Sequence, residues 1–398
     1  MKKIYLALCI IILGMTLGAC MEQNTFSGTA TIEFRLSNSS LYHSEQVESG
    51  NLIQEPELPS YQDYTFKGWY KDQMFRHLWN FETDLVSNHT TLYAKFVTEI
   101  THTVSKQNGV NNLNEPTYQS VVETIEVCVE PKVVVSFALE VAEIFNTLGL
   151  SKTGITHFGL PKSNLPEMVS VYNESKYTNV GTLFVPNYDA LDLMMPDMIF
   201  IGGRSSNLYE TLKQRYPNTD IVDVSNSNFS FDKQTKVFEN LGKIFYSLKS
   251  ELNTYIDEFN FSVTAIKQKS TGKDALFLLV NDDNLSVFGS GSRYGVIYNE
   301  FGFNPSDPGA QTLESHGNIV SFEYVSAVNP SIIFLLDRSQ ALGSSGAIDL
   351  IMNNQLIKNT KAGQVNAIYI LNADSWYILP GGIESTLQMI EDIEQVFS

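Results

Sequence analysis

Two segments of this chain carry the same order of residues at the same spacing. In the first, Asp189 precedes a proline, an apolar run and Arg204; in the second, Glu323 precedes a proline, an apolar run and Arg338. A helix that ends before a proline, a buried strand and a cation after the strand are typical of an α/β unit. Because the unit occurs twice, we expect an α/β fold with two similar Rossmann-like lobes.

The two arginines of this repeat indicate a ligand site. In open α/β sheets, ligands bind outside the carboxyl ends of the strands. Arg204 and Arg338 each follow an apolar, strand-like run, so each lobe would offer a guanidinium to whatever lies between the lobes. The acids, Asp189 and Glu323, lie at the other end of the repeat and are expected to face something else.

A long amphipathic segment separates the two copies. Apolar residues recur at steps of three and four from Val237 to Ile266, which predicts one continuous helix over about residues 232–270. Such a helix would span about 40–50 Å, enough to connect two lobes. We therefore expect an N-lobe over about residues 119–231 and a C-lobe over about residues 271–398.

The N-terminus has the features of a secretory signal. Two lysines, an apolar run and the sequence Leu-Gly-Ala precede Cys20, and this arrangement resembles the bacterial lipobox. The resemblance implies that residues 1–19 are removed, that Cys20 is lipidated, and that residues 20–28 tether the protein to the extracytoplasmic face of the cell membrane. An ordinary signal peptide and an uncleaved anchor helix are the alternatives.

The remaining cysteines do not predict a disulfide. Cys9 would leave with the signal peptide, and Cys128 lies in an apolar run that favours a buried, unpaired thiol. With 398 residues and 43% hydrophobic content, the chain can form a sizeable core without disulfides.

The charge balance limits the partners. A net charge of −18 argues against nucleic acid and against anionic membrane surfaces. An anionic ligand would need clustered positive charge. Arg293, in a glycine-rich turn after a strand-like run, is a third candidate for a ligand-binding arginine, after Arg204 and Arg338. That turn departs from the dinucleotide-binding pattern and lacks the P-loop lysine, so nucleotide binding is not expected. Three arginines can donate forked hydrogen bonds to carboxylate, hydroxamate or catecholate oxygens.

The region before the lobes has a different character. Residues 29–97 alternate strand-like runs with turns and contain YTFKGWYKD and TLYAKF, which resemble the internalin-type B repeat, or Listeria-Bacteroides repeat. The resemblance implies a small β-grasp-like module, and a single copy favours a spacer over an adhesive array. Residues 98–118 are rich in Asn, Gln and Ser and are predicted to form a linker.

Residues 119–398 resemble a class III substrate-binding lipoprotein of an ABC importer, of the type that binds ferric catecholate siderophores such as petrobactin. The resemblance rests on the segments GLPKSNLPEMV, KYTNVGTLFVPNYDALDLMMPDMIFIGGRSS, FGSGSRYGVIYNEFG, SHGNIVSFEYVSAVNPSIIFLLDR and NADSWYILPGGIES. It implies that Arg204, Arg293 and Arg338 hold an anionic iron complex in the cleft, with no intrinsic cofactor.

The same resemblance implies roles for three more residues. His316 and Tyr377 match positions that complete the iron shell in relatives with open-coordination chelates, and lining the cleft is the alternative. Trp376 would stack on an aromatic group of the ligand or belong to the core.

The two acids of the repeat are expected to contact the membrane permease. In the family, one carboxylate on each lobe docks into arginine pockets of the permease. Glu323 matches well, whereas Asp189 is shorter than the usual glutamate by one methylene. Both could instead stabilise a helix N-terminus.

The sequence also allows two other functions. A receptor of the same class could bind haem or a cobalamin-type ligand, and a surface protein could act through the B repeat by adhesion. An enzyme is not expected, because none of the motifs Gly-x-Ser-x-Gly, His-Glu-x-x-His or Cys-x-x-Cys occurs. The receptor is expected to be a monomer.

Overall fold

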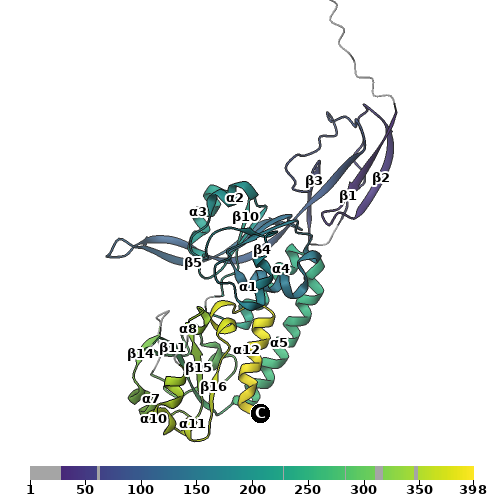
Figure 1. The fold of residues 1–398 in the computed structure, drawn as a ribbon. Helices are drawn as coiled ribbons and strands as arrows, with labels where there is room; N and C mark the ends of the chain where they lie inside the picture. The colour runs from purple at the N-terminus through teal and green to yellow at the C-terminus, as the bar shows by residue number, and fades with distance from the viewer. Residues whose placement is uncertain (1–27, 61–62, 227, 283, 310–316, 345–347) are drawn as a thin grey trace, which may run out of the picture.

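The computed structural model describes residues 28–60, 63–226, 228–282, 284–309, 317–344 and 348–398. It contains a small N-terminal module, an N-lobe and a C-lobe, arranged along one long axis (Figure 1). The signal peptide, the tether and Cys20 lie outside the described residues. Within the described ranges, no helix is long and apolar enough to cross a membrane.

The N-terminal module is a small mixed sheet, as its alternating sequence predicts. Its strands are β1 (Thr29–Arg35), β2 (Leu41–Glu48), β3 (Thr65–Tyr70) and β4 (Thr90–Val110), in the order β2-β1-β4-β3. The central pair, β1 and β4, is parallel. Every second residue of β1 is buried, and these side chains pack around Trp69, which is 1% exposed.

The prediction of a linker over residues 98–118 is wrong. Strand β4 continues to Val110 without a break and pairs with β5 (Pro116–Cys128) in a long antiparallel hairpin, which projects beyond the N-lobe (Figure 1). Alternate residues of β4, among them His102 and Val104, are buried. Only some of the polar residues that suggested a linker form the turn, where Asn111 Oδ1 accepts hydrogen bonds from two backbone N–H groups; Ser105 and Gln107 lie in β4.

The N-lobe is a parallel sheet with helices and the hairpin packed on it. Its strand order is β10-β9-β6-β7-β8, and all four pairings are parallel. The strands are β6 (Val133–Ser136), β7 (His157–Leu160), β8 (Thr178–Asn179), β9 (Met198–Ile201) and β10 (Asp220–Asp223). The helices are α1 (Leu139–Leu148), α2 (Tyr188–Met194) and α3 (Tyr209–Arg215), with 3₁₀ turns η1 (Leu150–Thr153), η2 (Glu167–Asn173) and η3 (Ser206–Leu208).

The connector between the lobes is two helices, not the one continuous helix that the periodicity predicts. Helix α4 (Phe231–Ile244) and helix α5 (Lys249–Ser270) are separated by the 3₁₀ turn η4 (Tyr246–Leu248). The break occurs at Phe245, whose backbone is not helical. The apolar spacing persists across the break because both helices bury their apolar faces in the same core. Helix α5 alone spans about 33 Å and runs beside both lobes (Figure 1).

The C-lobe sheet is mixed. Its order is β14-β12-β11-β15-β16, with β13 also on β11; β15 and β16 are parallel to β11, and β12 is antiparallel to it. The strands are β11 (Asp274–Asn281), β12 (Asn284–Phe288), β13 (Asn304–Pro305), β14 (Asn318–Val320), β15 (Ile333–Asp337) and β16 (Ile368–Ile370).

Short helices surround this sheet, and the last long one returns to α5. They are α6 (Val296–Asn299), α7 (Phe322–Val328), α8 (Arg338–Ala341), α9 (Ile348–Asn353), α10 (Gln355–Lys358), α11 (Lys361–Gln364), a π-helical turn η5 (Asp374–Ile378), α12 (Glu384–Glu394) and η6 (Gln395–Phe397).

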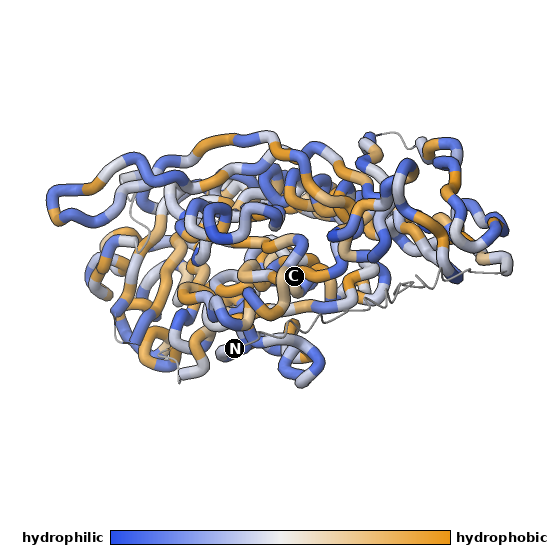
Figure 2. Tube along the Cα trace, turned by 90° about the horizontal axis from the view of Figure 1, so that it is seen from above, coloured by the Kyte–Doolittle hydropathy of each residue, from blue (hydrophilic) through white to orange (hydrophobic). Residues whose placement is uncertain are grey.

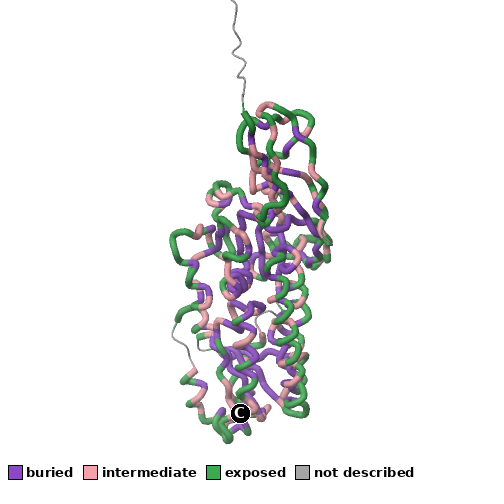
Figure 3. The backbone as a smooth tube through the Cα atoms, turned by 90° about the vertical axis from the view of Figure 1, so that its right-hand side faces the viewer, coloured by how far each residue is buried: buried purple, intermediate pink, exposed green. Residues whose placement is uncertain are grey.

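The two lobes share one hydrophobic core. Buried residues of both sheets form a single cluster with the apolar faces of α4, α5 and α12. Figure 2 shows hydrophobic residues concentrated along the interior strands and hydrophilic residues on the outer turns. Figure 3 shows buried residues throughout both lobes, whereas the outer parts of the module are largely exposed. The lobes are therefore tied together by packing as well as by the chain.

The repeated pattern corresponds to the same structure in both lobes, as predicted. Helices α2 and α7 each end at a residue in the left-handed conformation, Met195 and Asn329, directly before the proline. The following strands are β9 and β15; Arg338 comes directly after β15, and Arg204 follows β9 after two glycines. Each helix also begins with a side-chain cap, because Asn187 and Ser321 accept a hydrogen bond from a backbone N–H of the first turn.

Candidate functional site: a cationic cavity between the lobes

A cavity of about 820 Å³ lies between the two lobes. Its wall contains apolar side chains from both lobes, including Phe137, Phe184 and Phe288, and polar groups that converge from several strand ends. A volume of this size suits a ligand of several hundred daltons. The position agrees with the general rule that open α/β sheets bind ligands at the carboxyl ends of their strands.

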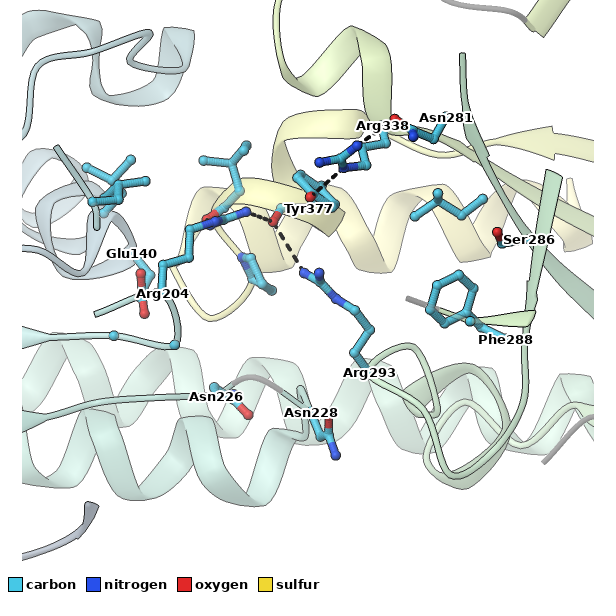
Figure 4. A pocket seen from close by; sticks show the side chains of 18 of the residues that line it. Glu140, Arg204, Asn226, Asn228, Asn281, Ser286, Phe288, Arg293, Arg338 and Tyr377 are labelled. Carbon is cyan, nitrogen blue, oxygen red and sulfur yellow. Dashed lines mark hydrogen bonds between the residues drawn. The ribbon is translucent and has the colours of Figure 1, made fainter. Parts of the chain in front are cut away.

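The three predicted arginines all lie in the wall of this cavity. Arg204 follows β9, Arg338 follows β15 directly, and Arg293 lies in the turn after β12. Figure 4 shows their guanidinium groups converging on Tyr377. The structure thus brings together three cations that are far apart in the sequence.

Tyr377 contacts all three arginines. Its carbonyl oxygen accepts hydrogen bonds from Arg204 Nη2 at 2.9 Å and from Arg293 Nη2 at 3.4 Å. Its hydroxyl oxygen accepts a hydrogen bond from Arg338 Nε at 2.7 Å. The three guanidinium carbons lie 5.2, 4.9 and 5.6 Å from the centre of its ring, within cation–π range. One residue therefore offsets part of the mutual repulsion of three like charges.

This surrounding charge changes the acidity of the phenol. Burial alone would raise the pKa of Tyr377, but the hydrogen bond from Arg338 and the charges of all three arginines outweigh it, so the pKa is lowered. A lowered pKa makes the anionic form of the phenol, which is the form that binds a hard cation, easier to reach.

The π-helical turn η5 positions this tyrosine and buries its neighbour. Trp376 is 2% exposed, and its indole N–H donates a hydrogen bond of 2.8 Å to Asp392 Oδ2. It packs in the shared core and does not line the cavity. From the sequence, Trp376 could either stack on the ligand or pack in the core. The structure places it in the core.

His316 lies outside the described residues. The next residue, Gly317, does line the cavity. Its φ is +72°, and a Cβ atom there would come within 2.6 Å of the Phe288 ring, so glycine is required at this point of the wall. Among the described residues, no group of three His, Cys, Asp or Glu side chains is arranged to hold a metal ion.

Several cavity residues were not predicted from the sequence. They comprise one carboxylate, four amides and one hydroxyl: Glu140, Asn226, Asn228, Asn281, Asn284 and Ser286. Asn281 is the last residue of β11, and its Oδ1 accepts a hydrogen bond of 2.6 Å from Arg338 Nη1. The strand-end rule that identified the arginines could have identified Asn281, because this residue follows an equally apolar run.

The two acids of the repeat lie away from the cavity. Asp189 and Glu323 are each in the first turn of their helix, α2 and α7, and both are exposed. Neither lines the cavity. Cys128, in contrast, is buried and unpaired, as predicted, and burial raises the pKa of its thiol.

Two α/β lobes around a cavity with three arginines are an arrangement typical of a ligand-binding protein. The chain belongs to the periplasmic binding protein family, whose model matches residues 134–375. A second model, the Listeria-Bacteroides repeat domain, matches residues 31–95. These matches agree with the predicted class III fold, with the N-terminal B repeat, and with the expectation that the chain is not an enzyme.

Two relatives are similar to this chain in sequence, and one of them has a crystal structure with a similar fold. The petrobactin-binding protein YclQ of Bacillus subtilis is 32% identical, over 66% of this chain and 82% of its own length. Its crystal structure superposes with a TM-score of 0.63, covering 74% of this chain and 99% of that one at 28% identity. The ferric-anguibactin-binding protein FatB of Vibrio anguillarum is 27% identical, over 61% of this chain and 77% of its own length.

Proposed function

We propose that this protein is a lipid-anchored, extracytoplasmic receptor that binds a ferric siderophore of the catecholate type and delivers it to an ABC importer permease. The observation that carries the proposal is the convergence of Arg204, Arg293 and Arg338 on one cavity between two lobes. In a chain of net charge −18, such a cluster is the local positive charge that an anionic ligand requires.

The chemistry of the cavity fits this class of ligand. Ferric catecholate complexes carry several negative charges on oxygens around the metal, and guanidinium forks bind such oxygens in pairs. Apolar and aromatic side chains line the rest of the cavity and can contact the flat faces of catechol rings. The names of YclQ and FatB, a petrobactin-binding and a ferric-anguibactin-binding protein, support a siderophore as the ligand.

The remaining parts of the chain have roles consistent with this one. Cys20 would carry the lipid, residues 29–97 would space the receptor from the membrane, and Asp189 and Glu323 would contact the permease. Tyr377, with its lowered pKa, and His316 would complete the iron shell when the chelate leaves coordination positions open. The receptor would act as a monomer without an intrinsic cofactor, since the iron arrives with its chelate.

Native mass spectrometry of the purified protein tests the proposed ligand. The protein is exposed to an equimolar pool of ferric catecholates, a ferric hydroxamate, haem and cobalamin, and then separated from unbound compounds. We expect a ferric catecholate to be retained. Retention of haem or cobalamin alone would replace the proposed ligand, and retention of nothing would favour a role in adhesion through the B repeat.

A further inference from the structure

Glu140 sets one part of the cavity apart from the rest. It lies in the first turn of α1, shortly after β6 ends, and lines the cavity wall on the N-lobe side. Among the described residues that line the cavity, it is the one carboxylate. Figure 4 shows it on the same side of the cavity as Arg204. Because a carboxylate would repel an anionic ligand, its presence in a cavity with three arginines needs a physical explanation.

Among the residues that the structure describes, the carboxylate has no hydrogen-bond or ion-pair partner besides its own backbone N–H group. Within the described part of the chain, no Lys, Arg or His nitrogen lies within ion-pair distance of it, and no other residue donates a hydrogen bond to it. Arg204, whose charge lowers the pKa of Glu140, directs its Nη2 to the carbonyl of Tyr377 instead. On its other side is Gly202, where an added Cβ atom would lie 2.9 Å from Glu140 Oε1.

Glu143, on the same helix, has a structural role and serves as a comparison. Glu143, one turn further along α1, is fully buried and accepts hydrogen bonds from the backbone N–H groups of Ile383 and Glu384 at the start of α12. It therefore fixes α12 to the N-lobe. Glu140 makes no such contact, and its side chain faces the cavity.

Stabilising the N-terminus of α1 is an insufficient reason for Glu140. A carboxylate in a first helical turn contributes roughly 0.3–1 kcal/mol, and an exposed position would serve equally well. In the cavity wall, burial raises the pKa of Glu140 to about 7, which means that its charged form is disfavoured there. A group that arrives with the ligand would supply the missing partner.

We propose that Glu140 receives a protonated amine of the ligand, so that the cavity selects a siderophore of mixed charge. The arginines take the anionic ferric chelate, and Glu140 takes an ammonium group on an arm of the same molecule. This inference rests on the proposed function and narrows its substrate class. It also gives the site selectivity, because a chelate without the ammonium group leaves Glu140 facing additional negative charge.

Isothermal titration with a matched pair of ligands tests this proposal. One ligand is a ferric tris-catecholate with a primary amine arm, and the other is the same chelate with that amine acetylated. The wild-type protein is compared with Glu140→Gln and with Glu239→Gln, which removes one exposed carboxylate from α4 outside the cavity.

We expect Glu140→Gln to weaken binding of the amine-bearing chelate by about ten- to hundredfold, the usual loss for one charge-assisted hydrogen bond. The same variant should bind the acetylated chelate as tightly as the wild type or more tightly, which also shows that the cavity is intact. Glu239→Gln should leave both affinities unchanged.

Two outcomes would overturn the inference. If Glu140→Gln changes the affinity for both chelates by the same factor, or changes neither affinity, Glu140 does not bind the ammonium group. If the wild type prefers the acetylated chelate, the carboxylate receives no cation. Failure of the wild type to bind either chelate would instead remove the proposed function itself.

Discussion

At the scale of single residues, burial of polar groups separates structural from functional side chains. His102, on the hairpin strand β4, is 5% exposed, and its Nδ1 accepts a hydrogen bond of 3.0 Å from the backbone N–H of Asp223. Its Nε2 is buried without a partner among the described atoms. This histidine holds the hairpin on the N-lobe sheet and must stay neutral to do so.

The pH dependence of stability tests this role of His102. Burial lowers the pKa of His102 to about 4, with Glu123 opposing the shift and Lys213 adding to it. Below pH 6.5 the unfolded chain therefore binds a proton at His102 that the folded chain does not. The contribution of neutral His102 to the free energy of unfolding is thus fully present above pH 6.5 and is lost as the pH falls toward 4. The loss is about 3 kcal/mol for one buried group of this kind.

His102→Asn places an amide oxygen near the position of Nδ1 and removes the titration. Chemical denaturation between pH 7 and pH 4 should show a shallower loss of stability for the variant than for the wild type. Identical pH profiles for the two proteins would mean that His102 does not stay neutral in the fold.

The residues that the sequence could and could not identify differ in a physical way. Arg204, Arg293 and Arg338 could be predicted because strand ends in α/β sheets meet at one edge, whatever the details of packing. Trp376 could not be assigned, because one rotation of the π-helical turn decides whether Trp376 or Tyr377 faces the cavity. Glu140 was missed because an acid in a first helical turn is common and indicates no particular ligand.

At the scale of elements, helices α2 and α7 are near copies of one another. Both begin with a side-chain cap, carry an exposed acid in the first turn and end in a left-handed residue before proline. Since Asp189 and Glu323 do not line the cavity, the permease contact that we propose for them can be tested separately from ligand binding.

The double variant Asp189→Asn with Glu323→Gln should keep its affinity for the ferric chelate within about twofold. Uptake of radioactive iron by cells that carry this variant should fall by at least about tenfold, as expected for the loss of charged contacts at an interface. Asp189→Glu, which restores the longer side chain, serves as the matched control and should support full uptake. Normal uptake by the double variant would show that these acids do not contact the permease.

Strand β4 joins the B-repeat module to the N-lobe without a flexible segment. It pairs with β1 and β3 in the module and continues into the hairpin with β5, which packs on the N-lobe sheet. Arg76 of the module adds a hydrogen bond of 3.0 Å from its Nη2 to the carbonyl of Met195 at the end of α2. Val129, after the hairpin, packs in the core of the module. The polar composition of residues 98–118 is typical of a linker, but Ile100, His102 and Val104 alternate with exposed residues as in a half-buried strand.

Small-angle X-ray scattering can test this rigid connection. When the scattering curve is fitted with an ensemble of conformations, the wild type should give one narrow distribution of maximum dimension. A glycine-serine insertion between Val97 and Thr98, combined with Arg76→Ala, should broaden it. The same insertion between Asn112 and Leu113, in the turn of the hairpin, is the control and should leave the distribution unchanged. A wild-type distribution as broad as that of the insertion would contradict a rigid connection.

At the scale of the whole molecule, the two lobes and the helices between them form one body around the cavity. The shared core and the bonds from Glu143 to α12 hold the lobes, so the three arginines keep their places relative to one another. The internal repeat predicted the two lobes, but the apolar spacing could not reveal the break at Phe245, because this spacing continues from α4 into α5. A cavity held in this way is largely preformed for its ligand.

The most direct test of the account is the affinity of the arginine triple variant for a ferric catecholate. Replacing Arg204, Arg293 and Arg338 together by glutamine keeps the approximate size of the side chains and removes three charges. Isothermal titration should show a loss of at least about a thousandfold, or about tenfold per charge-assisted contact. Arg215→Gln, on the exposed face of α3, is the control and should bind as the wild type does. Wild-type affinity in the triple variant would contradict the claim that this cavity binds an anionic iron complex.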